Sequence, residues 1–366
     1  MSVTPQDVTA ALGTVIDPYT GKDFVSMRCI RNLVVGEGSV SFALELGYPA
    51  RGQHEAIRHL LVEALTNALP GVGRLDIDLS SKIMPHVVRN GVKLMPGVKN
   101  VIAVASGKGG VGKSTTAVNL ALALAAEGAR VGLLDADIYG PSLPQMLGVS
   151  GQHPDSIDGK VMEPVVAHGL QMNSIGLLVD VDTPMVWRGP MATQALNQLL
   201  RETRWQELDY MVVDLPPGTG DIQLTLAQNV PVTGAVIVTT PQDIALIDAR
   251  KGLKMFEKVN VPILGVVENM SIHICPRCGH EEHIFGTGGG QKMCADYGIA
   301  FLGALPLDLD IRQETDSGKP TVAAHPTGRI AAIYREIALR TAAAIACQPR
   351  DMSHKFPVIV VQNAPG

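Results

Sequence analysis

Eight residues near the first third of the chain have the types and spacing of a phosphate-binding loop. Residues 107–114 read Gly-Lys-Gly-Gly-Val-Gly-Lys-Ser, which satisfies the pattern G-x-x-x-x-G-K-S. Glycines let the backbone curl so that successive N–H groups face phosphate oxygens. We expect Lys113 to reach the β- and γ-phosphates and Ser114 to offer a hydroxyl to Mg²⁺. The predicted nucleotide-binding residues of this loop are Gly107, Lys108, Gly109, Gly110, Val111, Gly112, Lys113, Ser114 and Thr115.

Three aspartates follow two other apolar runs of strand length. Asp135 and Asp137 come after the run at 130–134, and Asp214 comes after the run at 209–213. Ligands of doubly wound sheets bind at the carboxyl ends of the strands, so these carboxylates are expected beside the loop. Asp214 fits the residue that holds Mg²⁺ through water, with Asp135 nearby in support. The alternative for Asp214 is a helix cap or a turn aspartate.

A pair of cysteines has the spacing of a metal site. Cys275 and Cys278 enclose Pro276, and Gly279 follows them. Such a turn brings two thiolates to the same side, where they can bind one metal centre together. A four-thiolate site needs four sulfurs, and the simplest completion is the same pair from a second subunit. The pair therefore predicts a 4Fe–4S cluster that bridges a homodimer.

Three other interpretations of this pair stay open. The two residues could form a redox dithiol, or a turn with two inert thiols. They could also be half of a zinc site that one further residue completes: His280, His283 or Cys294. We expect Cys29, Cys294 and Cys347 to be packing residues, and five scattered cysteines are not a disulfide framework.

The elements that position these residues alternate between strand and helix from Asn100 onward. This predicts an α/β fold with a doubly wound, mostly parallel sheet of the P-loop NTPase type, preceded by a small α+β domain. The predicted strands of the sheet are 101–105, 130–134, 209–213, 234–239, 262–267 and 299–303. The first strand of the small domain is expected at Val25–Val35. The predicted division is a small domain at 1–80, a linker at 81–97, an ATPase domain at 98–347 and a tail at 348–366.

Composition limits the possible partners. The chain has 366 residues, of which 46% are apolar and 18% charged, and a formal net charge of −5, as is ordinary for a globular protein. No apolar run reaches the roughly 18 residues of a membrane span, and the N-terminus lacks the order of a signal peptide. We expect a cytoplasmic protein without membrane partners. No basic patch is visible in the sequence, which disfavours nucleic acid as a partner.

The loop and the motifs after it resemble a known family. Lys108 directly after the first glycine gives the form found in deviant Walker A ATPases, such as MinD, ParA and the nitrogenase iron protein. Four further motifs follow in order: D-A-D-x-Y-G-P-S, D-x-P-P-G-T-G-D, E-N-M-S and C-P-x-C-G. Together with the loop, they make the chain similar to the Mrp/ApbC family of iron–sulfur cluster carriers. The small domain resembles the N-terminal unit of iron–sulfur assembly factors. Several relatives have a cysteine in the loop that corresponds to Gly47–Gly52, and this chain has none there.

The resemblance implies roles for individual residues. Lys108 would cross a dimer interface to the partner's nucleotide, and Asp137 would orient the attacking water. Asn269 would contact adenine, unless it is a plain turn residue, and Pro306 would lie in a second loop beside the base. The implied catalytic residues are Lys108, Lys113 and Asp137; the magnesium residues are Ser114, Asp137 and Asp214; the second switch is Pro216, Pro217 and Gly218.

The function implied is that of an ATP-binding and ATP-hydrolysing carrier. Its homodimer would receive a labile 4Fe–4S cluster from an upstream scaffold or donor protein and pass it to apo-proteins. Hydrolysis is expected to be slow, because no residue resembles a strong general base. We expect ATP to close the dimer through the contacts of Lys108, and we expect the loop that carries Asn269 to transmit this closure to the cysteine pair. The alternatives are a MinD/ParA-like positioning ATPase with a structural zinc site, and an electron-transfer ATPase.

Overall fold

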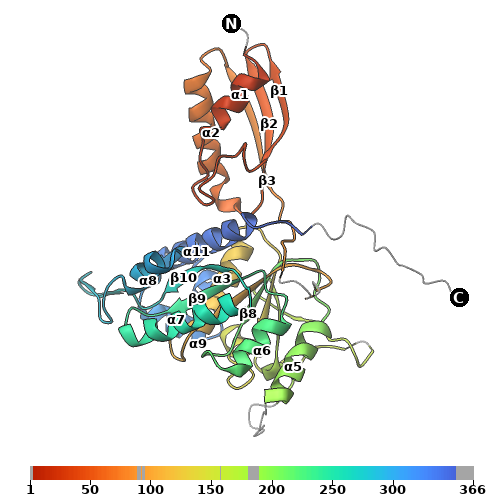
Figure 1. The fold of residues 1–366 in the computed structure, drawn as a ribbon, viewed down its shortest axis with the longest axis vertical. Coiled ribbons are helices and arrows are strands. Elements are labelled where there is room, and N and C mark those ends of the chain that lie inside the picture. The colour runs from red at the N-terminus through yellow and green to blue at the C-terminus, as the bar shows by residue number, and fades with distance from the viewer. Residues whose placement is uncertain (1–2, 89–91, 93–94, 157, 180–188, 352–366) are drawn as a thin grey trace, which may run out of the picture.

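The computed structural model describes residues 3–88, 92, 95–156, 158–179 and 189–351. Figure 1 shows a small α+β unit at one end of a larger sheet domain, with helix α11 of the larger domain nearest to it. The elements of the small unit are α1 (Pro5–Leu12), β1 (Ile30–Gly36), β2 (Ser39–Leu46), α2 (His54–Ala68) and β3 (Arg74–Ser81). Their order confirms the predicted helix, strand, strand, helix, strand.

The small unit forms because its helices each bury one face against a three-stranded sheet. Strand β2 lies in the middle, antiparallel to β1 and parallel to β3. Its side chains alternate between buried and half-buried, as expected for a strand that packs one face on a core. The Thr4 side chain caps α1 in a capping box with Asp7, and Pro5 occupies the first turn.

The predicted start of the first strand was wrong. The strand begins at Ile30 and not at Val25, because residues 23–28 form turns in which the backbone N–H of Ser26 donates to Asp23 Oδ1 at 2.7 Å. Arg28 then has a φ of 54°, which breaks any extended run. Cys29 consequently lies just before the strand, and it is buried as a packing residue should be.

The larger domain contains an eight-stranded sheet in the order β13-β10-β9-β4-β8-β5-β7-β6. Its pairs are parallel except for β6 with β7. The bounds are β4 (Val98–Ala105), β5 (Val131–Asp135), β6 (Val165–Ala167), β7 (Leu170–Ser174), β8 (Leu208–Asp214), β9 (Gly234–Thr239), β10 (Ile263–Glu268) and β13 (Phe301–Ala304). All six predicted strands are confirmed; β4 starts three residues before its predicted start, and every other strand end lies within two residues of its prediction.

Helices cover both faces of this sheet (Figure 1). One face packs against α3 (Lys113–Ala126) and α11 (Arg329–Ala346), and the other packs against α5 (Gly189–Arg201), α7 (Asp243–Lys258) and α8 (Gly289–Tyr297). The remaining helices are α4 (Leu143–Met146), α6 (Asp221–Asn229), α9 (Leu309–Asp316) and α10 (Thr321–Ala324). Within the described residues, none of these helices has the length and apolar content needed to cross a bilayer.

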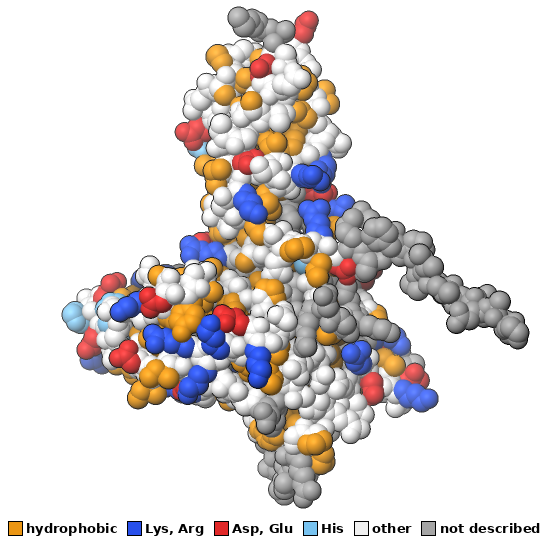
Figure 2. Space-filling model, viewed as in Figure 1, with side chains coloured by type: hydrophobic (Ala, Val, Ile, Leu, Met, Phe, Trp, Pro, Cys, Tyr) orange, Lys and Arg blue, Asp and Glu red, His pale blue; other side chains and the backbone are white. Residues whose placement is uncertain are grey.

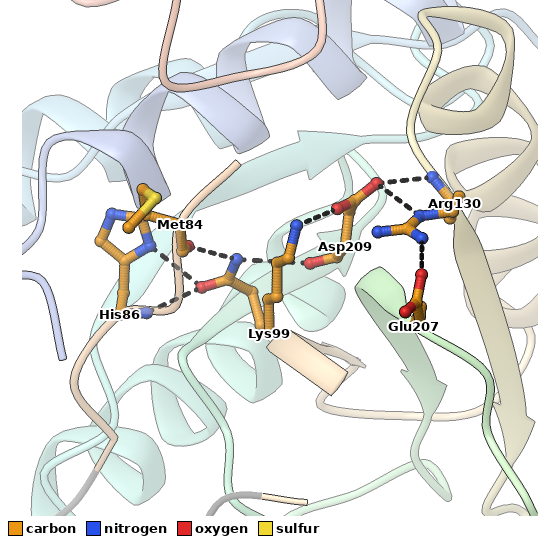
Figure 3. Close-up of polar contacts among 7 residues, drawn as sticks. Met84, His86, Lys99, Arg130, Glu207 and Asp209 are labelled. Carbon is orange, nitrogen blue, oxygen red and sulfur yellow. Dashed lines mark hydrogen bonds and ion pairs between the residues drawn. The ribbon is translucent and has the colours of Figure 1, made fainter. Parts of the chain in front are cut away.

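The segment predicted as a linker is held against the sheet domain. Figure 3 shows Met84 and His86 of this segment near Lys99 of β4. The contacts come from Asn100, the next residue of β4. Its Nδ2 donates to the carbonyl of Met84 at 3.0 Å, and its Oδ1 accepts from the backbone N–H of His86 at 3.2 Å. His86 also forms a β-bridge with Arg350. The linker and the first residues of the predicted tail therefore brace each other, while residues 352–366 lie outside the described residues.

A buried carboxylate joins the small unit to the sheet domain. Glu127, at the end of α3, accepts the backbone N–H of Gly52 at 2.7 Å and pairs with Arg335 of α11 at 2.6 Å. Its side chain is fully buried. Tyr19 adds a hydrogen bond from its hydroxyl to Glu336 on the same helix. The Gly47–Gly52 loop, which lacks a cysteine here, thus meets the larger domain.

Candidate nucleotide and metal site

The phosphate loop lies between β4 and α3, at the carboxyl end of the central strand. Gly110 and Gly112 have φ values of 81° and 80°, in the left-handed region that favours glycine. A Cβ at residue 107 would come within 2.2 Å of the Asp248 backbone in α7, so only glycine fits there. The loop opens the N-terminus of α3, where free N–H groups and the helix dipole favour an anion.

Lys113 is surrounded by the predicted acidic residues. Its Nζ lies 2.6 Å from Asp214 Oδ1 and 3.6 Å from Asp137 Oδ2, and only 6% of its side chain is exposed. The same Nζ lies 3.2 Å from Ser114 Oγ. Asp135 is fully buried, and its Oδ2 accepts from the Ser174 hydroxyl at 3.0 Å. The structure therefore brings the loop and the strand-end aspartates together, as the sequence predicts.

The charges at this site are unbalanced, since three carboxylates surround one ammonium. Burial, together with the charge of Asp214, raises the pKa of Asp135 to about 7. Burial also raises the pKa of Asp137 and of Asp214. Asp214 Oδ2 is buried and has no hydrogen-bond partner among the described residues. A divalent cation that prefers oxygen ligands fits this surplus of buried negative charge.

The predicted second switch contacts the phosphate loop. The backbone N–H of Gly218 donates to the carbonyl of Ser106 at 2.9 Å, and Gly218 has a φ of 102°. A Cβ at Gly109 would lie 4.0 Å from Pro217, so the two segments are in contact distance of one another. A change of the loop on nucleotide binding would therefore reach residues 216–218 directly.

Asn269 is more than a turn residue. It is buried, and its Nδ2 donates to the carbonyl of Val111 in the phosphate loop at 2.9 Å. Pro306 is also buried, and its two neighbours bond to the segment that follows Asn269: the Ser271 N–H donates to the Leu305 carbonyl, and the Leu307 N–H donates to the Ile272 carbonyl. Asn269 thus lies at the phosphate loop and Pro306 beside the segment after it, and the contact of either residue with adenine stays a prediction.

The cysteine pair lies at the tip of a short hairpin formed by β11 (His273–Ile274) and β12 (Glu281–Glu282). Cys278 is exposed and Cys275 half-buried. Backbone N–H groups of Arg277 and Cys278, with the Cys278 thiol, lower the pKa of Cys275. This favours the thiolate, which is the form that binds metal. No hydrogen bond or ion pair among the described residues joins the hairpin directly to the phosphate loop.

The described residues do not complete a metal site within one chain. No group of three or more His, Cys, Asp or Glu side chains in the part of the chain that the structure describes could hold a metal ion. Cys294 is buried in α8, where its Sγ contacts the carbonyl of Ala300 at 3.5 Å. His283 Nδ1 lies 3.0 Å from the Ser271 carbonyl. Of the three predicted zinc ligands, only His280 is both exposed and on the hairpin.

The structure shows a basic groove that the sequence interpretation missed. Thr219 and Gly220 of the second switch line it, together with four cations on α7: Arg250, Lys251, Lys254 and Lys258. Lys251 pairs with Asp248 and Lys254 with Glu257, so part of this charge is compensated. Figure 2 shows blue side chains near orange ones in this region of the larger domain. The spacing of residues 250, 254 and 258 on one helix face could have revealed it.

A strand, a glycine-rich loop and a helix, with strand-end aspartates around the loop lysine, define a P-loop NTPase. The family described as NUBPL iron-transfer P-loop NTPase matches residues 97–342, and the family described as iron-sulfur cluster assembly protein matches residues 5–77. Because the first match covers more than half of the chain, the protein belongs to this family of iron-transfer P-loop NTPases. The predicted family and fold class are confirmed.

Several relatives resemble this chain over most of its length. The iron-sulfur cluster carrier protein of Salmonella typhimurium is 67% identical over 247 residues, which are 68% of this chain and 67% of the relative. The protein of the same name from Haemophilus influenzae is 50% identical over 321 residues, 88% of this chain and 86% of the relative. The solved nucleotide-binding protein of Archaeoglobus fulgidus, in complex with ADP, aligns with a TM-score of 0.55 and 38% identity over 61% of this chain and 88% of that one.

Proposed function

We propose that this protein is an ATP-hydrolysing carrier whose homodimer holds a labile 4Fe–4S cluster and transfers it to apo-proteins. The observation that carries the proposal is the accessible pair Cys275 and Cys278, which has no third ligand among the described residues of its own chain. The relatives' names supply the chemistry of the cargo. Two copies of the hairpin would supply the four thiolates that such a cluster needs.

The phosphate loop supports the same dimer. Among the described residues, no hydrogen bond or ion pair involves the Lys108 ammonium, although its carbonyl accepts from Ser106 Oγ at 2.9 Å. An ammonium that its own chain does not use is suited to a phosphate held by the partner. Lys108 is therefore assigned the contact across the dimer.

Hydrolysis would depend on positioning and charge. Loop N–H groups and Lys113 bind the phosphates, and Lys113 then exchanges its partner Asp214 for phosphate oxygens. Mg²⁺, held by Ser114 and by Asp137 and Asp214 through water, would neutralise charge on the transferred group. Asp137, half-buried beside Lys113, orients the attacking water. Because no stronger base stands out among the described residues around Lys113, turnover would be slow.

A transfer assay tests this function. The chain is loaded with iron and sulfide without oxygen and mixed with an apo-enzyme that requires a 4Fe–4S cluster, and the recovered activity of that enzyme is measured. Cys275→Ser with Cys278→Ser should abolish recovery, and Cys294→Ala, a buried thiol in α8, should leave it intact. Lys113→Ala should lower ATP hydrolysis by about 100-fold or more while the cluster still loads. Full recovery with the double cysteine variant would refute the proposal.

A further inference from the structure

The segment that carries the cysteine pair begins and ends beside one buried carboxylate, that of Glu268. Glu268 ends β10 and is 1% exposed. Its Oε1 accepts the Ser271 hydroxyl at 2.9 Å, at the start of the segment, and its Oε2 accepts the Gly290 N–H at 2.5 Å, at the end. Residues 271–290, including the hairpin, are thus fixed at both ends by one side chain.

The next residue connects this carboxylate to the nucleotide loop. Asn269 donates its backbone N–H to the Thr239 carbonyl at 2.7 Å and its Nδ2 to the Val111 carbonyl. A Cβ at Gly112 would lie 2.1 Å from that Nδ2, so the contact is close. Residues 268 and 269 therefore contact the phosphate loop on one side and the cysteine segment on the other.

A buried glutamate is a costly way to hold a segment if stability alone matters. Glu268 forms no ion pair with a described residue, and its two hydrogen bonds replace full hydration. The fit is also restrictive, since a Cβ at residue 290 would lie 2.9 Å from Oε2. Such an arrangement suits a group that fixes geometry between two sites.

We propose that Glu268 is a positioning residue that couples the nucleotide state of the phosphate loop to the placement of Cys275 and Cys278. When nucleotide moves Val111, Asn269 follows, and Glu268 shifts both ends of the cysteine segment together. This inference rests on the proposed function, because it describes how ATP would regulate the same two thiols. Its test uses the protein without a cluster.

The test measures how fast each cysteine is alkylated by iodoacetamide, by mass spectrometry, with and without a non-hydrolysable ATP analogue and Mg²⁺. In the unaltered protein, nucleotide should change the rates at Cys275 and Cys278 by about fivefold or more. In Glu268→Leu, which removes both acceptor oxygens at a similar side-chain volume, this ratio should fall to about one, with nucleotide affinity within about twofold. Glu127→Gln removes a buried carboxylate at the other end of the domain and should keep the full ratio.

Ser271→Ala removes only the contact at the start of the segment, and it replaces Glu268→Leu in the test if Glu268→Leu does not fold. It should lower the ratio at least partway. A normal ratio in the folded Glu268→Leu, or in Ser271→Ala when Glu268→Leu does not fold, overturns the inference. So does the absence of any nucleotide effect in the unaltered protein. Iron and sulfide counts on the same samples report separately on the proposed function, which fails if the unaltered protein binds no cluster.

Discussion

Asp214 has a carboxylate oxygen, Oδ2, that is buried without any hydrogen-bond partner among the described residues. A residue placed for stability would not leave such an atom unpaired. We therefore predict that Asp214→Asn costs the nucleotide-free protein less than about 1 kcal/mol, because the Asn Oδ1 can still accept from Lys113 Nζ and Asp137 remains beside that ammonium. Thermal unfolding should show that stabilisation by Mg²⁺ and an ATP analogue is lost.

Asp209 provides the matched control at the opposite end of β8. Figure 3 shows its carboxylate between Lys99 and Arg130. Its Oδ1 lies 2.7 Å from Lys99 Nζ, and its Oδ2 accepts the backbone N–H of Arg130 at 2.9 Å. Asp209→Asn should cost about 1–3 kcal/mol and keep the magnesium-dependent shift. The opposite pattern, with Asp214→Asn strongly destabilising and still responsive to Mg²⁺, would contradict the metal assignment.

The raised pKa of Asp135 gives a pH dependence with a definite sign. Its folded pKa of about 7 lies above the unfolded value of 3.8, so the folded state binds more protons between these values. The free energy of unfolding of the nucleotide-free protein therefore falls as pH rises from about 4 to 7, because the folded state must then give up a proton that it binds more tightly than the unfolded state does. Mg²⁺ offsets the same negative charge, and its stabilising effect with ADP should be larger at pH 8 than at pH 6. Melting curves with Mg²⁺ or with EDTA, each with ADP, measure this, and equal shifts at both pH values would be evidence against it.

At the scale of residues, the sequence predicts the loop and its aspartates because a short pattern fixes their chemistry. Glu268 escaped prediction as an anchor, since its partners Ser271 and Gly290 are joined to it only by the fold. Asn269 was predicted near the base, and its bond to Val111 could not be foreseen from spacing. A local sequence pattern does not predict contacts between residues that lie far apart in the chain.

At the scale of elements, hydrophobic runs of strand length located all six predicted strands of the large sheet. Residues 81–97 contain Pro85, Pro96 and Gly97, which indicate a linker, and the docking of this segment depends on Asn100 in a strand that follows it. The first strand was placed too early because turn residues 23–28 include apolar Val25 and Met27. Apolar content alone does not separate a packed turn from a strand.

The contact between the small unit and α11 can be tested on one helix. Arg335→Ala removes the cation that pairs with the fully buried Glu127, and breaking such a pair should cost about 3 kcal/mol. Protease cleavage within residues 82–97 should become faster as the unit loosens. Arg340→Ala, which breaks only the exposed pair with Glu336, should cost less than about 0.5 kcal/mol. Equal effects of the two substitutions would show that Glu127 does not hold the junction.

At the scale of the whole molecule, one chain contains all the residues predicted for the nucleotide loop but only two of the four thiols that the proposed cluster needs. The loop carries its own lysine, hydroxyl and aspartates, whereas the hairpin offers two thiols and no third ligand among the described residues. Lys108 is unused by its own chain in the same sense. A second copy of the chain would account for both features.

The proposed dimer is tested most directly by the iron, sulfide and subunit count after anaerobic reconstitution, with native mass spectrometry of the product. We expect two chains with four irons and four sulfides, a cluster that is lost in Cys275→Ala with Cys278→Ala and retained in Cys294→Ala. One zinc ion per chain on a monomer, displaced by Cys294→Ala or by His280→Ala, would contradict it.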